Sequence, residues 1–547
     1  MKNNMIAIFI VALACLYSKS SFAQSAADAR PNILMIVADD LGYADLGCYG
    51  GEIKTPNIDA LAGKGILFTH FHTSPLCAPS RSMLLSGNDN HVAGMGSMFS
   101  VAGTNRAGKP GYERHLTDRI VTIAQLLKDG GYQTFMSGKW HLGSANDEIP
   151  LSKGFEKSFA LMNGGANHFN NHPFSPNDPP QYRLDSSVVL YPDGSYSTDV
   201  YTDKMMGYIR QRQSGKPFFA YLAYTAPHWP LQVPGNYIDR YKGRYDMGYD
   251  SLRAIRFASQ KAAGIVPENA VLRERNPEIR PWTDLGAEEK KSESRKMEIY
   301  AAMVENLDDH IGQLIQFLTK SGLLDNTVIV FMSDNGAAGE DFYNLPKGFG
   351  PFIRAHYDNS YANMGTASSF VSYGPQWAQA GAAPFKLYKA YATEGGIVTP
   401  LIISGKFIDR KPGIDRSLIS VMDLAPGFLD LAQLSYPEVY KNKKMTPQLG
   451  SSFVPYLKKQ NDRIHSDEYD LGLEHDGQCM LIRGQWKITN ISQPFDETAF
   501  ALYDLSNDIA ETNDLSKSNP AKYTEMLHEW ELFIKKVGVV SKEKGEE

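Results

Sequence analysis

Four apolar runs along this chain each end in a small group of polar residues. The runs cover residues 32–38, 134–137, 217–223 and 327–332, and they are largely continuous rather than alternating. Continuous apolar runs of this length are typical of strands that are buried on both faces of a parallel sheet. Helical periodicity lies between them, most clearly over residues 120–129 and 296–320. This alternation predicts an α/β fold with a large, mostly parallel sheet flanked by helices.

The polar groups at the ends of these runs are candidates for one common site. Asp39-Asp40 follows the first run, Gly138-Lys139-Trp140-His141 the second, Pro227-His228 the third and Ser333-Asp334-Asn335-Gly336 the last. Ligands of open α/β sheets bind beyond the carboxyl ends of the strands. Taken alone, each group is more simply explained as a turn or as a packed histidine.

Four of these residues offer only oxygen ligands for a metal ion. They are Asp39, Asp40, Asp334 and Asn335. Hard cations such as Ca²⁺ or Mg²⁺ choose carboxylate and amide oxygens, whereas zinc sites need a Cys/His pattern that this sequence lacks. The sequence therefore predicts a site for a hard divalent cation, with two ordinary Asp turns as the alternative.

The segment Cys77-Ala78-Pro79-Ser80-Arg81 begins a short helical run that Gly87 closes. Pro79 suits the first position of a helix, where a missing N–H costs nothing. The free N–H groups at a helix start attract an anion, and Arg81 lies one turn further on with a planar fork of donors. The alternative is an ordinary helix start with a buried, inert thiol.

The length of 547 residues suits one large α/β core with a smaller domain behind it. After about residue 440 the pattern changes to short strands and an amphipathic helix over residues 521–536. We therefore expect a catalytic domain over residues 24–440 and an α+β subdomain with an antiparallel sheet over residues 441–547. Residues 231–295 and 340–385 look like irregular insertions of the kind that wall an active site.

Residues 1–23 resemble a secretory signal peptide. Lys2 precedes an apolar run, and Ser21-Phe22-Ala23 is a small-x-small cleavage site. We expect an exported protein, periplasmic or secreted, with lipoprotein anchoring at Cys15 as the less favoured alternative. Further segments of transmembrane length are lacking. The net charge of −6, without a basic block, gives no support for a nucleic-acid partner.

Three cysteines remain if Cys15 is removed with the signal peptide. An odd number makes a poor disulfide framework for an exported protein. If Cys77 is modified, Cys48 and Cys479 are left, and nothing in the sequence requires that these two pair.

The order of the motifs resembles the type I, formylglycine-dependent sulfatase family. The resemblance runs from about residue 31 to about residue 530 and looks closest to the bacterial arylsulfatases. The segments that carry the family resemblance are Thr55-Pro56-Asn57-Ile58-Asp59-Ala60-Leu61-Ala62, Cys77-Ala78-Pro79-Ser80-Arg81, Gly138-Lys139-Trp140-His141-Leu142-Gly143, Ala226-Pro227-His228, Ser333-Asp334-Asn335-Gly336 and Glu394-Gly395-Gly396-Ile397. Those typical of the bacterial subgroup are Lys109-Pro110-Gly111-Tyr112-Glu113, His228-Trp229-Pro230-Leu231 and Tyr373-Gly374-Pro375-Gln376-Trp377-Ala378.

The resemblance implies an alkaline-phosphatase-like fold and the hydrolysis of an aryl or carbohydrate sulfate monoester to an alcohol or phenol plus inorganic sulfate. It implies that a maturation enzyme oxidises Cys77 to formylglycine, whose hydrated diol attacks sulfur and forms a covalent sulfo-enzyme. It also implies one Ca²⁺, bound by the modified Cys77 together with Asp39, Asp40, Asp334 and Asn335.

The same resemblance assigns roles to five further residues. Arg81 would steady the diol, and Lys139 and Lys389 would bind the sulfate. His228 and Lys389 would protonate the leaving group, and His141 would take the proton of the second hydroxyl. Lys389 is chosen for its spacing before Glu394-Gly395-Gly396, with Lys386 as the runner-up.

One position departs from the family pattern, because Val398 stands where an arginine commonly follows the Glu-Gly-Gly-Ile motif. The packing of that loop and the substrate subsite beside it are therefore open. Two alternatives to the sulfatase interpretation remain. One is a phosphodiesterase or phosphonate monoester hydrolase that uses the same aldehyde, and the other is a non-catalytic protein that binds sulfate esters.

Overall fold

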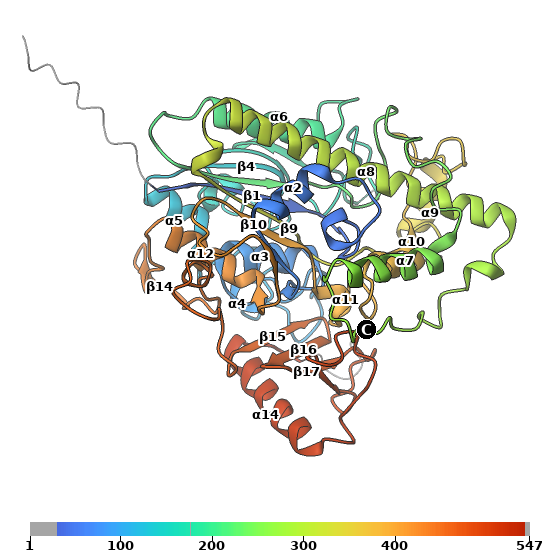
Figure 1. The fold of residues 1–547 in the computed structure, drawn as a ribbon. Helices are drawn as coiled ribbons and strands as arrows, with labels where there is room; N and C mark the ends of the chain where they lie inside the picture. The colour runs from blue at the N-terminus through green and yellow to red at the C-terminus, as the bar shows by residue number, and fades with distance from the viewer. Residues whose placement is uncertain (1–29, 176, 542–547) are drawn as a thin grey trace, which may run out of the picture.

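A ten-stranded sheet forms the centre of the molecule (Figure 1). The computed structural model describes residues 30–175 and 177–541, so the predicted signal peptide and Cys15 lie outside the described residues. The strands, in spatial order, are β11 (Gly413–Asp415), β2 (Ile66–Phe68), β10 (Leu401–Ser404), β9 (Thr327–Ser333), β1 (Asn32–Ala38), β8 (Phe218–Ala223), β4 (Gln133–Lys139), β5 (Lys157–Leu161), β6 (Tyr182–Leu184) and β7 (Ser187–Val189).

The five strands in the middle of the sheet, from β9 to β5, are parallel to one another. Antiparallel pairs flank them on both sides, where β10 meets β9 and β6 meets β5. Every residue of β1 and β9 is buried, as their continuous apolar sequences require. The predicted α/β fold with a mostly parallel, mixed sheet is therefore confirmed.

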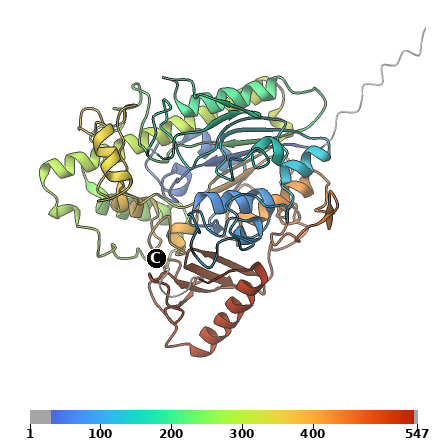
Figure 2. The ribbon, with the colours of Figure 1, turned by 180° about the vertical axis from the view of Figure 1, so that it is seen from behind.

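Helices cover both faces of this sheet (Figures 1 and 2). One layer contains α2 (Pro56–Lys64), α6 (Ser197–Arg210) and α8 (Ala287–Lys320), and the other contains α3 (Cys77–Ser86), α5 (Ile123–Asp129) and α12 (Leu424–Leu431). Helix α8 begins well before the predicted residue 296, because the Glu289 carboxylate accepts a 2.8 Å hydrogen bond from the Gly286 N–H and caps the helix start.

The two predicted insertions contain more helix than their sequences suggest. Helix α7 (Gly248–Ala262) lies in the first, and α9 (Phe349–His356) and α10 (Gly374–Gly381) lie in the second. The buried face of α7 contains charged and polar residues as well as apolar ones. Arg256, for example, is fully buried and forms ion pairs with Asp45 at 2.6 Å and Glu52 at 2.8 Å.

A four-stranded antiparallel sheet and one long helix form the C-terminal part of the structure, and this predicted sheet is confirmed. Its elements are β15 (Asp470–His475), β16 (Gln478–Arg483), β17 (Trp486–Asn490), β18 (Ala501–Asp504) and α14 (Pro520–Val537). In β16, Leu481 packs in the cluster that includes α14, while Met480 and Ile482 join the main core. The sheet is thus covered on both faces (Figure 2), and the boundary at residues 440/441 stays a prediction.

Several further short elements lie along the described chain. They are β3 (Phe71–His72) paired with β12 (Ile419–Ser420), β13 (Val439–Tyr440) paired with β14 (Lys443–Lys444), and helices α4 (Asn90–Ala93), α11 (Glu394–Ile397) and α13 (Val454–Leu457). Within the described residues, the thiols of Cys48, Cys77 and Cys479 are free.

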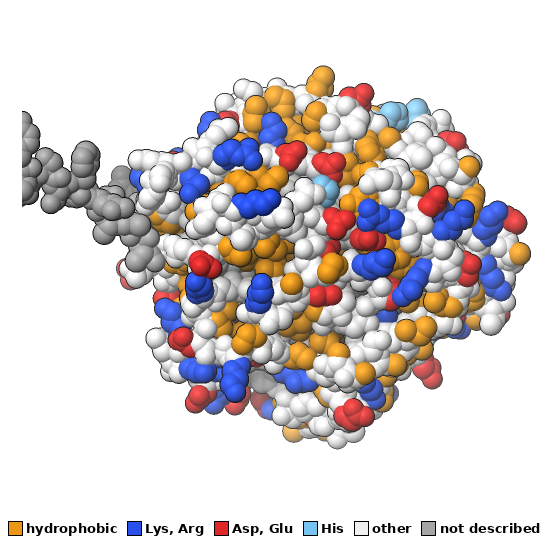
Figure 3. All heavy atoms as spheres, turned by 45° about the horizontal axis from the view of Figure 1, so that its top comes forward, with side chains coloured by type: hydrophobic (Ala, Val, Ile, Leu, Met, Phe, Trp, Pro, Cys, Tyr) orange, Lys and Arg blue, Asp and Glu red, His pale blue; other side chains and the backbone are white. Residues whose placement is uncertain are grey.

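Acidic and basic side chains are interspersed on the face shown in Figure 3. This face therefore carries no large area of a single charge that would attract a polyanion. Among residues 30–175 and 177–541, none of the helices has the length and apolar character needed to cross a membrane.

Candidate active site

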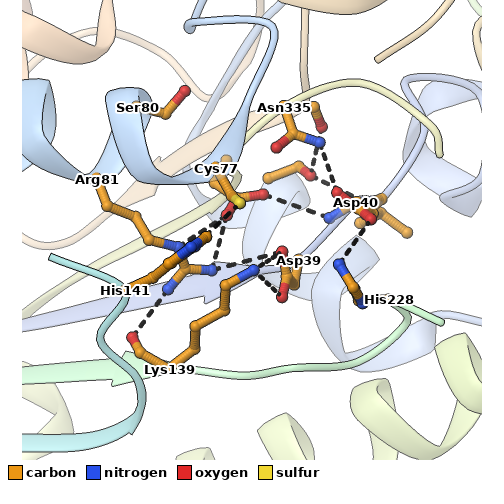
Figure 4. A network of polar contacts seen from close by, with 12 residues as sticks. Asp39, Asp40, Cys77, Ser80, Arg81, Lys139, His141, His228 and Asn335 are labelled. Atoms are coloured by element: carbon orange, nitrogen blue, oxygen red, sulfur yellow. Dashed lines mark hydrogen bonds and ion pairs between the residues drawn. The ribbon is translucent and has the colours of Figure 1, made fainter. Parts of the chain in front are cut away.

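The carboxyl ends of four central strands meet at one point (Figure 4). Strand β1 lies between β9 and β8, so Asp40 leaves it beside Asp334, whose Oδ1 accepts a 3.3 Å hydrogen bond from the Asp40 N–H. The loop after β8 carries His228, and β4 ends at Lys139. The convergence expected from parallel topology is present, and Cys77 and Arg81 enter the same cluster from α3.

Each buried carboxylate in this cluster has a cationic partner from the chain. The Lys139 ammonium lies 3.0 and 2.8 Å from the two oxygens of Asp39. Lys389 lies 2.9 Å from Oδ2 of Asp40. For the third carboxylate, Asp334, the partner is Arg81, at 2.8 Å through Nε and 2.7 Å through Nη2. Each of the three aspartates thus has a cation of the chain beside it, and Lys389 is shared between Asp40 and Glu340.

The two adjacent aspartates respond differently to this environment. Burial raises the pKa of Asp39 well above its usual value, against the attraction of Lys139 and with further repulsion from Asp334. Burial also acts on Asp40, but Lys389 and His228 together hold the pKa of Asp40 below its usual value. The crowded carboxylates would therefore gain from an additional cation.

The oxygen atoms of the cluster fit a hard cation. One oxygen each of Asp39 and Asp334 and the sulfur of Cys77 lie within 4.8 Å of one another. Asn335 donates a 2.7 Å hydrogen bond to Asp40, yet its own buried Oδ1 has no hydrogen-bond partner in the described chain. A buried amide oxygen without a partner is costly, and a hard cation is a suitable partner for it.

Cys77 is the first residue of α3 and is 3% exposed. Its Sγ lies 3.3 Å from Nδ1 of His141 and 3.9 Å from the sulfur of Met98. Burial raises the pKa of the thiol despite the opposing influence of Lys139. An unmodified Cys77 is therefore a poor nucleophile, because the thiolate is the reactive form.

The start of α3 corrects the predicted place of Pro79. The helix begins at Cys77, so Pro79 is its third residue and not its first. Proline is tolerated there for the same reason, because the first four N–H groups of a helix have no partner within the helix.

His141 reaches the cluster by a route that the sequence analysis did not predict. A fully extended segment would place Lys139 and His141 on one face, but β4 ends at Lys139 and His141 has a φ of 58°. This left-handed turn carries the His141 ring to Cys77 (Figure 4). Burial, with repulsion from Lys139 and Arg81, lowers the pKa of His141 well below its usual value, so the ring is a neutral base.

His228 is held in one orientation by the backbone. Its Nδ1 donates a 2.6 Å hydrogen bond to the Trp229 carbonyl, which leaves Nε2 facing Oδ2 of Asp40 at 3.5 Å. Burial lowers the pKa of His228 well below its usual value and outweighs the attraction of Asp40.

The structure separates the two candidate lysines. Lys389 joins the cluster and also forms a 2.9 Å ion pair with Glu340. Lys386 instead donates a 3.2 Å hydrogen bond to the Tyr503 hydroxyl in the C-terminal sheet. All of the predicted site residues except the runner-up Lys386 therefore lie together.

The sequence analysis missed several residues around the site. Gly164 and Gly165 lie against the rings of His141 and His228, where an added Cβ would come within 2.6 Å and 3.0 Å of the respective Cε1 atoms. Glu340 follows Gly336 closely in the chain, and this closeness to a predicted site segment could have identified it as a site residue. A pocket of about 850 Å³ bounded by His141, Gly164 and Met98 opens next to the cluster.

A buried ionic network joins the C-terminal sheet to the loop that carries Lys389. Lys487 of β17 lies 2.6 Å from Glu394 and 2.9 Å from Glu511, and all three are almost fully buried. Glu394 begins α11, and the next N–H, that of Gly395, donates a 3.0 Å hydrogen bond to the Lys386 carbonyl. Through its ion pair with Glu394, Lys487 therefore holds in position the loop that carries Lys389.

Comparison with known proteins places the chain in a family. The model of the sulfatase family matches residues 31–434. An uncharacterized sulfatase of Schizosaccharomyces pombe is 40% identical, covering 95% of this chain and 96% of the relative. An arylsulfatase of Klebsiella aerogenes is 41% identical, covering 79% and 92%. The crystal structure of Ps i-CgsB in complex with k-i-k-neocarrahexaose has a TM-score of 0.63 at 25% identity and covers 92% of both chains. This chain therefore belongs to the sulfatase family and is a sulfuric ester hydrolase.

Proposed function

We propose that the chain hydrolyses sulfate monoesters with a formylglycine made from Cys77 and with one Ca²⁺ held by Asp39, Asp40, Asp334 and Asn335. The observation that carries the proposal is the position of the Cys77 sulfur among the oxygens of Asp39 and Asp334. A soft thiol does not suit a hard, oxygen-based ligand set. With its raised pKa, the thiol is also a poor nucleophile. An oxygen at position 77 would serve both roles.

The cofactors supply two kinds of chemistry when present. The hydrated aldehyde offers an oxygen nucleophile and a second hydroxyl, and the cation offers positive charge for the sulfuryl oxygens. Three cationic groups lie in the cluster around Asp39 and Asp40: the ammonium groups of Lys139 and Lys389 and the guanidinium of Arg81. They bind the sulfuryl group of the substrate and fix its orientation.

The two histidines suit opposite proton transfers. Nδ1 of His141 lies 3.3 Å from Sγ of Cys77. Because the low pKa of His141 keeps its ring neutral, the ring is free to accept a proton from a hydroxyl at position 77. Nε2 of His228 faces the cluster beside Lys389, and these two groups are placed to donate a proton to the leaving oxygen. The negative charge of a bound sulfate ester would raise the pKa of His228 toward this task.

Mass spectrometry of the peptide across Cys77, on protein from the native host, tests the proposed nucleophile. We expect the loss of one sulfur, the gain of one oxygen and the removal of two hydrogens. An unmodified thiol in fully active protein would refute the formylglycine.

Parallel rates on matched aryl sulfate and aryl phosphate esters test the reaction. A faster sulfate reaction is expected, and a faster phosphate reaction would favour the phosphodiesterase or phosphonate monoester hydrolase alternative. Tight binding of a sulfate ester without turnover, on protein that lacks an aldehyde at position 77, would favour the non-catalytic alternative.

A sulfated glycan is the substrate class that we favour over a simple aryl ester. Ps i-CgsB has been crystallised with a neocarrahexaose, and the pocket of about 850 Å³ beside His141 is large enough for a sugar ring or more. We also propose that residues 1–23 direct export to the periplasm or medium, that a formylglycine-generating enzyme matures the chain, and that residues 24–440 and 441–547 form the catalytic domain and the α+β subdomain.

The substitution Gly164→Ala is expected to lower kcat on the order of 10²-fold, because displacing an aligned catalytic group by about 1 Å has an effect of that size. The added Cβ would lie 2.6 Å from Cε1 of His141 and force this ring to move. Steady-state kinetics on an aryl sulfate measures the effect. Gly63→Ala in α2 is the matched control, since its Cβ meets no atom within 4 Å. Wild-type kcat in Gly164→Ala would show that the ring position of His141 is unimportant.

The substitution Lys487→Met is expected to raise KM about tenfold and to lower Tm, because it leaves the buried carboxylates of Glu394 and Glu511 without their shared cation. The double variant Lys487→Met/Glu511→Gln removes one of these charges and should recover Tm but not KM, since Lys389 remains unsupported. Lys487→Arg should recover both. Recovery of KM together with Tm in the double variant would reduce Lys487 to a purely structural role.

A further inference from the structure

A second cationic pocket lies outside the cluster around Cys77. Its volume is about 610 Å³, and it lies where α7, α10, the segment of residues 272–278, the Lys386 loop and the C-terminal part meet. Four of the side chains that line it are basic and two are acidic: Arg253, Arg273, Arg275 and Lys386, against Glu274 and Glu278.

Arg253 is the unusual member of this pocket. It is 7% exposed, and only one of its terminal nitrogens, Nη1, is used, in a 2.6 Å hydrogen bond to the Arg273 carbonyl. Nε and Nη2 of Arg253 are buried and have no hydrogen-bond partner among the described residues. Buried guanidinium groups are normally paired with an anion, so these two donors point to a missing partner.

The surrounding charges leave Arg253 without a counterion. Asp250, the carboxylate that attracts it most, is engaged by Nη1 of Arg275 at 3.2 Å and by the Trp282 N–H at 2.8 Å. Burial lowers the pKa of Arg253 to about 10, with repulsion from Arg273 and Arg275, so the side chain is still charged at neutral pH. Within the described chain, none of the ion pairs involves Arg253.

Lys386 links this pocket to the catalytic loop. Lys386 lines the pocket, and its backbone carbonyl accepts hydrogen bonds from Thr393 Oγ1 at 2.7 Å and from the Gly395 N–H at 3.0 Å. Burial lowers the pKa of Lys386, with repulsion from Arg273 opposing the attraction of Glu511. An anion in the pocket would thus be attracted by Lys386 as well as by the three arginines.

We propose that this pocket binds a sulfate-type oxyanion at a site separate from the catalytic one, with Arg253 as its principal ligand. A guanidinium fork with two adjacent free donors matches two oxygens of such a group. The anion has two possible sources: free inorganic sulfate, which is the product of the reaction, or a second sulfate group on a polysulfated glycan. The second source rests on the proposed function, and the first does not.

Counting bound sulfate tests the site directly. Equilibrium dialysis with radiolabelled sulfate should find two sites on the wild-type protein and one on Arg253→Met. Lys389→Ala should also keep one site, and crystals of it soaked in selenate should show an anomalous peak at Arg253. An unchanged sulfate count in Arg253→Met would overturn this proposal, whereas an unchanged count in Lys389→Ala would instead count against the proposed catalytic site.

Thermal unfolding separates a binding role of Arg253 from a structural one. Because its charge is unpaired, replacement by methionine should leave Tm without sulfate unchanged or raised. The increase in Tm on adding sulfate should be smaller than in the wild type or in the control Arg463→Met, whose side chain is 62% exposed. A lowered Tm without sulfate, with the full sulfate-induced increase retained, would show that Arg253 serves the fold alone.

Kinetics distinguishes the two sources of the anion. If the pocket holds a second sulfate group of the substrate, Arg253→Met should raise KM about tenfold for a disulfated oligosaccharide and leave KM unchanged for an aryl monosulfate. If it holds free sulfate, KM should be unchanged for both substrates while the dialysis count still falls by one. Both results support an oxyanion site and assign its ligand.

Discussion

Replacing Cys77 with serine is expected to lower kcat by about 10⁴-fold or more, which is typical for the loss of a covalent nucleophile. Serine provides one hydroxyl where the proposed hydrated aldehyde provides two. It can attack sulfur, but it cannot then expel sulfate by re-forming an aldehyde. Intact-protein mass spectrometry after incubation with an aryl sulfate should therefore find Cys77→Ser carrying a covalently bound sulfuryl group or unreacted, and not turning over.

Two further variants make this result specific. Cys77→Ala has no hydroxyl and should be inactive without any added mass. Cys48→Ser removes a free thiol elsewhere in the chain and should retain wild-type kcat, since its backbone N–H keeps the 2.8 Å hydrogen bond to Asp59. Turnover by Cys77→Ser within tenfold of the wild type would refute the need for a second hydroxyl at position 77.

Sequence patterns predicted those parts of the site that depend on sheet topology. Buried parallel strands read as continuous apolar runs, and their carboxyl ends must lie at one edge, so Asp40 and Asp334 could be placed together although 294 residues separate them. The position of Cys77 followed from its place at a helix start together with the family resemblance. These inferences need only local patterns and one topological rule.

Other features depend on tertiary contacts that no local pattern reveals. The buried face of α7 mixes apolar Tyr249 and Leu252 with charged Arg256, which meets Asp45 and Glu52, so no simple apolar period marks this helix. The turn at His141 depends on one left-handed residue, which is rare outside glycine. The role of Lys487 depends on the position of β17 behind α11, because its partners Glu394 and Glu511 are distant in sequence or in a separate loop.

The charge balance of the active site sets the expected result of removing calcium. Asp39, Asp40 and Asp334 each have a cation from the chain, so the fold does not require an ion to neutralise them. Chelation should therefore lower kcat by about 10²-fold or more, since a bound cation and the groups it orients contribute several kcal/mol to such reactions. The chelated protein should still unfold cooperatively, with a Tm that rises again when Ca²⁺ is added.

Substitutions at Asn335 separate this view from one in which the ion holds the fold together. Asn335→Ala removes the unpartnered Oδ1 and should weaken Ca²⁺ binding while changing Tm in chelator only slightly. Asn335→Asp adds a fourth buried carboxylate without a cation of its own, so it should lower Tm markedly in chelator and recover it in Ca²⁺. Asp325→Asn, at a side chain that is 80% exposed, is the control and should show neither effect. If Asn335→Asp and the wild-type protein had equal Tm values in chelator, the pairing of each carboxylate with a cation of the chain would be refuted. Full activity in chelator would refute the metal site, which is built on the same three carboxylates.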